Sequence, residues 1–215
     1  MADFIIDKTL KKILPFFSYV FHPIFIPILA ALFYFIIGIK YYNSPQIFLV
    51  LVQILVLTVV IPMLLYLILY LTKRVKSLVV ANVKQRRFPL FVNMLLICIL
   101  LFKSSLSLYF PHLYLFFWGE LFTVFLALIL VLLHHKASLH MAGITGITMF
   151  TINLSILLKT SFLPYIIIFV LLSGIVATSR LYMKAHTPKE LCTGTLIGVL
   201  PQLLWLFMTL NNIFV

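Results

Sequence analysis

The sequence predicts an all-α integral membrane protein, a polytopic helical bundle in which six to seven helices cross the bilayer. Hydrophobic residues make up 64% of the 215 residues and charged residues only 9%, against roughly half and a quarter in a typical soluble domain. The mean hydropathy of +1.23 is too high for a soluble globule of this size, because a water-exposed surface needs far more polar residues. Lipid is therefore the expected solvent of most of the chain.

Long apolar runs locate the expected helices, since one crossing of a bilayer needs about 20 apolar residues. The first run contains His22-Pro23 and Pro27, which predict a kink. The third run begins at Pro89 and its uninterrupted apolar stretch ends near Phe102, which leaves the count at six or seven. The predicted spans are residues 16–39, 46–72, 88–106, 109–133, 141–158, 161–178 and 190–213.

No internal repeat, low-complexity tract or soluble region interrupts these runs, so residues 1–215 are expected to form a single transmembrane domain. The charged residues are mostly basic: 16 Lys and Arg against four Asp and Glu, a formal net charge of +12. In a soluble protein this balance would suggest nucleic acid. Here the basic residues lie between apolar runs, so membrane lipids and a phosphorylated lipid are the expected partners, and nucleic acid is not.

Polar residues gather in three stretches between the spans, at 73–87, 134–140 and 179–190. If all seven runs span, two crossings separate each stretch from the next, so all three lie on the same face as the N-terminus. All but three of the 16 Lys and Arg residues then fall on that face. The positive-inside rule predicts that it is the cytoplasmic face of a cell (inner) membrane. The three exceptions are Lys40, Lys103 and Lys159.

The third polar stretch has the most specific pattern. Arg180 precedes His186 by six residues, Glu190 follows His186 by four, and Pro188 is typical of the start of a helix. A carboxylate in the first helical turn can accept a proton from one imidazole nitrogen and leave the other free to attack. The Arg180 guanidinium offers a planar fork for phosphate oxygens. The alternative is an ordinary interfacial loop whose basic residues meet lipid headgroups.

The stretch resembles the third signature of the type 2 phosphatidic acid phosphatase family. That signature is Ser-Arg, five residues, His, three residues, Asp; here it reads Ser179-Arg180, His186 and Glu190 at the same spacing. The family's second signature, Pro-Ser-Gly-His, is similar to Ala137-Ser138-Leu139-His140, and its first, Lys, six residues, Arg-Pro, is matched loosely by residues 84–89. The three occur in the family's order and cover roughly residues 84–198.

The resemblance implies a role for each matching residue. His186 would be the nucleophile that takes the phosphoryl group, Glu190 would orient it, and His140 would be the general acid for the leaving oxygen. The substrate would be a lipid phosphate monoester or a polyprenyl phosphate or diphosphate. Two histidines can divide this chemistry between them, so no metal or other cofactor is expected. The side chains expected to hold the phosphoryl oxygens are Arg180, Arg87, Lys84, Arg86, Ser138 and Lys136.

The chain departs from the family's pattern in ways that keep a second function open. Glu190 is one methylene longer than Asp, and Leu139 replaces a glycine whose backbone could approach a phosphate more closely. The spacing of the first signature also differs. The alternative is a catalytically inactive relative that binds or carries anionic lipids. A third hypothesis, a metal transporter that uses His134 and His135, is weakened by the near absence of acidic residues from the spans.

Overall fold

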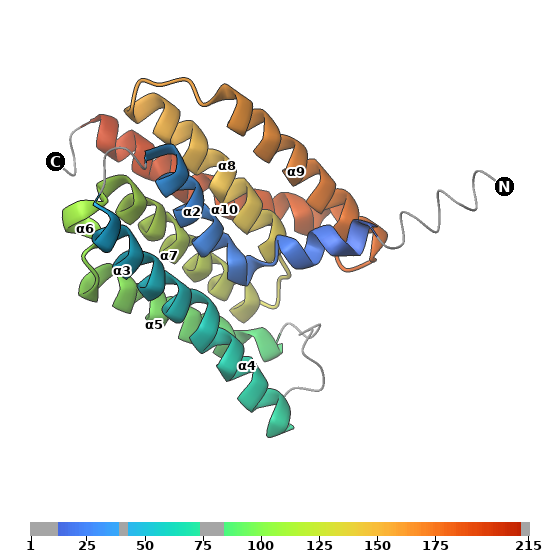
Figure 1. Cartoon of the computed structure of the whole chain (residues 1–215). Coiled ribbons are helices and arrows are strands. Elements are labelled where there is room, and N and C mark those ends of the chain that lie inside the picture. Colours follow the sequence, from blue (N-terminus) through green and yellow to red (C-terminus); the bar gives the residue numbers. More distant parts are fainter. Residues whose placement is uncertain (1–12, 39–42, 74–83, 212–215) are drawn as a thin grey trace. The chain divides into compact units, whose positions relative to one another are not determined.

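The fold is an all-α polytopic bundle. The computed structural model describes residues 13–38, 43–73 and 84–211 (Figure 1), with the Lys84 side chain left out. Every regular element in those ranges is a helix. Residues 74–83, which make up most of the first polar stretch, lie outside the described residues. The end of the last predicted span, at residues 212–213, also lies outside them.

The chain divides into two compact units. Unit 1 contains residues 1–23 and 137–215, and unit 2 contains residues 24–136. Each unit is described by itself. The single functional domain expected for 1–215 stays a prediction, because this division concerns only how the helices pack.

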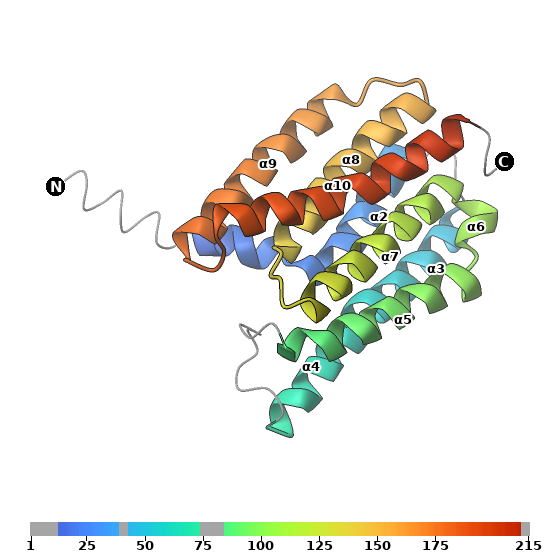
Figure 2. The same cartoon turned by 180° about the vertical axis from the view of Figure 1, so that it is seen from behind.

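Unit 1 is built around α8 (Leu139–Leu157), which packs against both α9 (Leu163–Tyr182) and α10 (Pro188–Leu210). Figure 2 shows α8 lying between these two helices. The unit also includes the N-terminal helix Ile13–Val20. Because α8, α9 and α10 follow one another through short connections, the start of α8, the end of α9 and the start of α10 come to one end of the unit.

Small residues let α8 and α10 approach closely. A Cβ added at Gly194 would overlap the Ser138 carbonyl oxygen, and one added at Gly198 would overlap the Ala142 carbonyl oxygen. Gly194 and Gly198 are four residues apart on α10. They face Ser138 and Ala142, which are also four residues apart, at the start of α8. This is the small-residue spacing that lets membrane helices pack backbone to backbone.

Buried polar side chains on α8 are satisfied within the unit. The Thr145, Thr148 and Thr151 hydroxyls donate to carbonyl oxygens one turn earlier at 2.7, 2.7 and 2.9 Å. The Asn153 amide donates to the Gln202 carbonyl oxygen of α10 at 2.9 Å. Such bonds offset the cost of placing polar groups away from water. They fit the position of α8, the most buried of the candidate spans.

Unit 2 begins at Ile24, within the 3₁₀ turn η1 (Pro23–Phe25), and continues with α2 (Ile26–Gly38). A long helix follows from Ser44 to Leu71, made of α3 (Ser44–Leu55), the π-helical segment η3 (Val56–Val60) and α4 (Ile61–Leu71). Pro62 explains the π segment. Its ring would clash with the carbonyl of residue 58 in a regular α-helix, and the wider turn avoids the clash without ending the helix.

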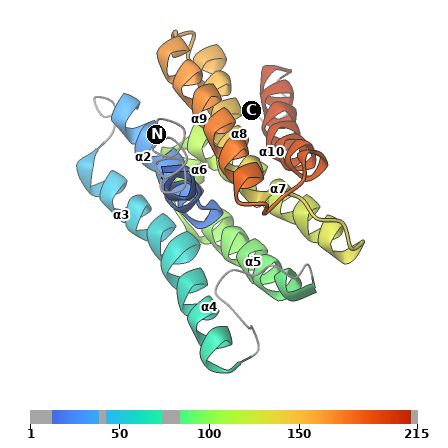
Figure 3. The same ribbon diagram turned by 90° about the vertical axis from the view of Figure 1, so that its right-hand side faces the viewer.

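The rest of unit 2 is a helical hairpin. A 3₁₀ turn, η4 (Lys84–Arg86), leads into α5 (Arg87–Lys103), and α6 (Leu106–Tyr109) connects it to α7 (Pro111–Leu132). The hairpin is formed by α5 and α7, which lie side by side (Figure 3). The connection is fixed by Phe110, which is fully buried and meets Phe35 of α2 edge to face at 4.9 Å between ring centroids.

Within the described residues each of the seven predicted spans is mainly helical, but not all are long enough to count as crossings. Among the described residues, five helices are long and apolar enough to cross a membrane, or six if Ile13–Val20 and Pro23–Gly38 form one broken span. The interruption falls at Phe21 and His22, where the proline-containing sequence predicts a kink. The third predicted span is α5, whose 17 residues extend about 25 Å, less than the roughly 30 Å of a bilayer core.

The close approach of α8 and α10 predicts unequal responses of three glycines to alanine. Gly194→Ala and Gly198→Ala should each destabilise the protein by about 1–3 kcal/mol, because the new methyl group forces two backbones apart. Gly174→Ala on α9 is the matched control. An added Cβ there meets nothing within 4 Å, and alanine favours a helix by up to about 1 kcal/mol.

Thermal unfolding in detergent measures these differences. We expect a lower midpoint for the two α10 variants and an equal or higher midpoint for Gly174→Ala. Equal midpoints for all three variants would contradict backbone contact between α8 and α10.

Candidate functional site

The second and third predicted signatures meet at one end of unit 1. Ser138 and His140 lie at the start of α8 and Arg180 in the last turn of α9. His186 lies two residues before α10, and Glu190 lies in the first turn of that helix. The Ser138 backbone N–H donates to the Glu190 carbonyl oxygen at 3.0 Å. This bond joins the two signatures directly, across 52 residues of sequence.

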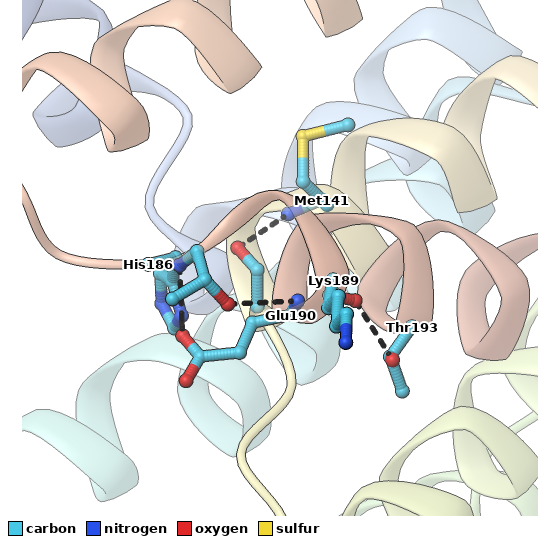
Figure 4. Close-up of polar contacts among 7 residues, drawn as sticks. Met141, His186, Lys189, Glu190 and Thr193 are labelled. Carbon is cyan, nitrogen blue, oxygen red and sulfur yellow. Dashed lines mark hydrogen bonds and ion pairs between the residues drawn. The ribbon is translucent and has the colours of Figure 1, made fainter.

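His186 and Glu190 form the best-defined pair in this group. The distance from His186 Nδ1 to Glu190 Oε2 is 2.8 Å, and Figure 4 shows the two side chains turned toward each other. The contact expected from their four-residue spacing is therefore made. Since an ionised carboxylate only accepts, Nδ1 carries the proton and Nε2 of a neutral His186 keeps its lone pair.

The start of α10 holds Glu190 in place. Thr187 is the N-cap and Pro188 the first helical residue, as the sequence predicts. The Thr187 hydroxyl accepts from the Glu190 N–H at 3.4 Å, and Glu190 Oε2 accepts from the Thr187 N–H at 3.2 Å. This capping box satisfies two backbone donors at once. One carboxylate oxygen therefore both caps the helix and fixes the His186 ring.

Burial separates the His186 ring from bulk water. Its side chain is 2% exposed and that of Glu190 is 22% exposed. Low local polarity strengthens the charge-assisted bond between the imidazole and the carboxylate. The His186 ring therefore has almost no contact with bulk water, whereas part of the Glu190 side chain remains accessible.

Ser138 has a structural task of its own. It is fully buried and serves as the N-cap of α8, where its hydroxyl accepts from the Met141 N–H at 3.4 Å (Figure 4). This bond satisfies one of the free backbone donors at the start of the helix. Its expected contact with a phosphate stays a prediction.

His140 is the second residue of α8 and contacts the N-terminal segment of the chain. His140 Nε2 is 3.1 Å from the Ser18 carbonyl oxygen. Its ring meets the His22 ring edge to face, with centroids 5.2 Å apart and planes at 86°. Arg180 and His186 are both within electrostatic range of His140, so these three basic groups share one region.

The end of α9 positions Arg180. The Arg180 carbonyl oxygen accepts from the Ala185 N–H at 3.1 Å, and the Leu181 carbonyl oxygen accepts from the Lys184 N–H at 2.9 Å. Lys184 adopts a φ of 51°, the left-handed conformation that usually closes a helix at glycine. The chain therefore reverses tightly between Arg180 and His186, which brings both side chains to the same end.

The remaining predicted phosphate ligands belong to unit 2. Arg86 and Arg87 lie at the junction of η4 and α5, and Arg87 Nη2 is 3.3 Å from His134 Nε2, just beyond the end of α7. Lys136 is half-buried, and the side chain of Lys84 lies outside the described residues. The structure does not place these four residues against those of unit 1, so their role in phosphate binding stays a prediction.

Sequence reasoning missed the contribution of the N-terminal segment to this group. Ser18 and Ser179 are buried, and their hydroxyl oxygens are 2.7 Å apart. Ser179 also donates to the Leu14 carbonyl oxygen at 2.6 Å. The only local signal was His22, whose imidazole is costly inside an apolar run unless it has a polar partner. Ser18 carries no recognisable pattern.

Within the described parts of the chain, no group of three or more His, Cys, Asp and Glu side chains is arranged to hold a metal ion. The two histidines of the transporter hypothesis bond to other groups. His134 meets Arg87, and His135 Nδ1 is 3.0 Å from the Leu133 carbonyl oxygen.

Comparison with known proteins finds no matching family model, no matching curated protein and no matching solved structure.

Glu190 both caps α10 and contacts His186. We therefore expect that two substitutions can separate the effect on protein stability from the effect on His186 reactivity. Thr187→Ala removes the N-cap hydroxyl and should lower the free energy of unfolding by about 1 kcal/mol. Glu190→Gln keeps a side chain that suits a capping box but removes the negative charge that polarises His186. It should change stability less than Thr187→Ala does.

The measurement is thermal unfolding of both variants, together with the rate at which diethylpyrocarbonate modifies His186. Modification should be slower in Glu190→Gln, because the imidazole loses its charged acceptor. Thr187→Ala should modify at close to the rate of the wild type. Equal rates in all three proteins would mean that the carboxylate does not activate the ring.

Proposed function

We propose that this chain is a membrane-embedded phosphatase that hydrolyses a lipid phosphate through a phosphohistidine intermediate. The observation that carries the proposal is the 2.8 Å contact between His186 Nδ1 and Glu190 Oε2. A histidine paired with a carboxylate has one nitrogen fixed as a donor and the other available as a nucleophile. The resemblance of residues 137–140 and 179–190 to the type 2 phosphatidic acid phosphatase signatures supports the same assignment.

In the first step His186 Nε2 attacks phosphorus and forms the N–P bond. The bond between phosphorus and the lipid oxygen breaks, and this oxygen takes a proton from His140. In the second step a water molecule attacks the phosphohistidine and gives a proton back to His140. The N–P bond breaks, inorganic phosphate leaves, and His186 returns to its starting form. Glu190 remains ionised and stabilises the positive charge that develops on the His186 ring.

Arg180 supplies the positive charge that phosphoryl transfer needs most. In the transition state charge is spread over three equatorial oxygens, so positioning and neutralisation dominate catalysis. A guanidinium can bind two of these oxygens in parallel. Arg180 lies within electrostatic range of His140, the proposed proton donor. The reaction written in this way uses side chains alone.

Lipid binding without hydrolysis would not require all of the side chains that unit 1 brings together. An anionic headgroup can be held by Arg180 and Lys184 without a histidine fixed on a carboxylate. The buried His186–Glu190 pair and the second histidine at position 140 have a direct use in acid–base and nucleophilic chemistry. We therefore favour the enzyme over the inactive lipid-binding relative.

The surroundings of the site support a lipid phosphate as the substrate class. The helices that carry it are long and apolar enough to cross a membrane, so an acyl or polyprenyl tail would stay in the bilayer. The phosphate would meet the end of unit 1 that holds Arg180 and His186. Lipid phosphate monoesters and polyprenyl phosphates or diphosphates all combine such a tail with such a headgroup.

We also propose that this end of unit 1 faces the cytoplasm. Arg180, Lys184 and Lys189 lie near the start of α10 and the end of α9, whereas Lys159 is the basic residue between α8 and α9 at the opposite end. Cytoplasmic ends of membrane helices are enriched in Lys and Arg. The charge distribution therefore favours a cytoplasmic site.

The proposed reaction predicts phosphate release from a lipid panel in the presence of EDTA. Phosphatidate and polyprenyl phosphate and diphosphate in mixed micelles are suitable substrates. His186→Ala and His140→Ala should each lower kcat by at least about 10³-fold for the preferred lipid. His135→Ala is the matched control, since this exposed histidine bonds to a loop carbonyl in unit 2 and should leave kcat unchanged.

Two results would contradict this proposal. Release at wild-type rates by both site variants would exclude the mechanism. Saturable binding of a lipid by the wild type, with no phosphate release and no phosphohistidine, would instead identify the inactive lipid-binding relative.

The proposed orientation predicts opposite labelling at the two ends of unit 1. In a background with Cys98→Ser and Cys192→Ser, Lys189→Cys should react with a membrane-impermeant maleimide in inside-out vesicles. Ser161→Cys, an exposed position between α8 and α9, should react in right-side-out vesicles. The reverse pattern would place the site on the outer face.

A further inference from the structure

The N-terminal segment 13–23 is far in sequence from the predicted signatures, yet it belongs to unit 1. It contacts the site through the Ser18 carbonyl oxygen and the His22 ring, both of which meet His140. Neither residue is part of the family's three signatures. The question is what these contacts do for His140.

The bond to Ser18 fixes which His140 nitrogen carries the proton. A backbone carbonyl oxygen can only accept a hydrogen bond, so His140 Nε2, at 3.1 Å from it, must be the N–H donor. His186 is held in the opposite way, with Nδ1 donating to Glu190. The two histidines are therefore fixed in opposite tautomers, with the lone pair on Nε2 of His186 and on Nδ1 of His140.

The acceptors also differ in charge, which suits different tasks. The carboxylate of Glu190 stabilises positive charge on His186, as a nucleophile that becomes cationic requires. The neutral carbonyl of Ser18 orients His140 without holding it in the protonated form, so that its proton can be released. The edge-to-face contact with the His22 ring restricts rotation of His140 about the bond to Ser18.

The segment is anchored independently of these two contacts. The Ser18 and Ser179 hydroxyls are 2.7 Å apart, and Ser179 donates to the Leu14 carbonyl oxygen at 2.6 Å. Both serines are buried. Because Ser179 adjoins Arg180, the same short stretch of α9 sets the position of the N-terminal segment and of the phosphate-binding guanidinium.

We propose that the Ser18 carbonyl and the His22 ring are part of the catalytic site, where they position His140 so that its Nδ1 protonates the leaving group. This inference rests on the proposed phosphatase function.

Protonated His140 gives its Nδ1 proton to the lipid oxygen as that oxygen takes the electron pair of the P–O bond. The N–P bond forms from the lone pair of His186 Nε2. Neutral His140 is left as the Nε2–H tautomer that Ser18 holds. In the return step Nδ1 takes a proton from the attacking water, and the N–P electron pair returns to His186.

Dependence on the leaving group tests this assignment. An alkyl phosphate such as dioctanoyl phosphatidate needs a proton on its leaving oxygen, whereas p-nitrophenyl phosphate releases a stable anion without one. His22→Ala should lower kcat for phosphatidate by about 10–100-fold, part of the 10²–10⁴-fold that general acid catalysis supplies. Its kcat for p-nitrophenyl phosphate should fall less than threefold, and KM should change little for either substrate.

Two matched variants separate positioning from other roles of His22. His22→Phe keeps an aromatic ring but cannot exchange a proton or bind phosphate, and it should recover most of the phosphatidate turnover that His22→Ala loses. Tyr19→Ala changes an exposed side chain of the same segment and should match the wild type. Equal losses by His22→Ala on both substrates, or a phenylalanine variant as impaired as the alanine variant, would overturn the proposal.

A disulfide between the segment and α9 provides the second test. The Ser18→Cys and Ser179→Cys pair, with Cys98→Ser and Cys192→Ser, replaces two hydroxyls 2.7 Å apart, close enough for an S–S bond. If the segment acts in its docked position, phosphatidate turnover should be the same in the oxidised and reduced forms of this variant. Loss of turnover on oxidation and recovery on reduction would show that the segment must leave, which would overturn the positioning role.

These outcomes are distinct from failure of the phosphatase itself. A wild-type protein that hydrolyses neither substrate would overturn the proposed function and this inference together. A wild-type protein that hydrolyses both, with no difference between the substrates in His22→Ala, would overturn this inference alone.

Discussion

Unit 1 depends on the close approach of two helix backbones. Because Gly194 and Gly198 carry no side chain, α10 can lie against the carbonyl oxygens of Ser138 and Ala142 on α8. This contact allows the Ser138 N–H to reach the Glu190 carbonyl oxygen. The starts of the two helices are thereby held together, with His140 in the first turn of α8 and His186 two residues before α10. Dispersion forces between close backbones, rather than water exclusion, supply the attraction in a lipid environment.

On this frame a few side chains each perform two tasks. Glu190 closes the first turn of α10 and orients His186. Ser179, the residue before Arg180, bonds both to the Ser18 hydroxyl and to the Leu14 carbonyl oxygen and so anchors the N-terminal segment. Combining tasks in this way limits the number of polar groups that must be buried, and each buried polar group is expensive in a membrane protein. It also makes the arrangement rigid, since moving one residue disturbs both a helix end and a ring.

The sequence predicted the parts of this structure that depend on local pattern. Apolar runs located the helices, His22-Pro23 located the break before α2, and Pro188 with the four-residue spacing located the His186–Glu190 pair. Other features depend on contacts that leave no local trace. Ser18 reaches His140 across 122 residues, and α9 turns at Lys184 where a glycine would be expected. The division into two units likewise arises from packing, which apolar content alone does not determine. The shortness of α5, in contrast, agrees with the early end of its apolar run near Phe102.

The docking of the N-terminal segment has a consequence for the biogenesis of the protein. Ser18 emerges from the ribosome long before its partner Ser179, which lies 161 residues later. The first helix therefore lies in the bilayer without its hydrogen-bond partners from the rest of the chain until most of that chain has been inserted. Its capture by α9 comes late in assembly, when His140 receives its final acceptor. A partly synthesised chain thus cannot carry out the proposed chemistry on the surrounding lipids before its last helices are in place.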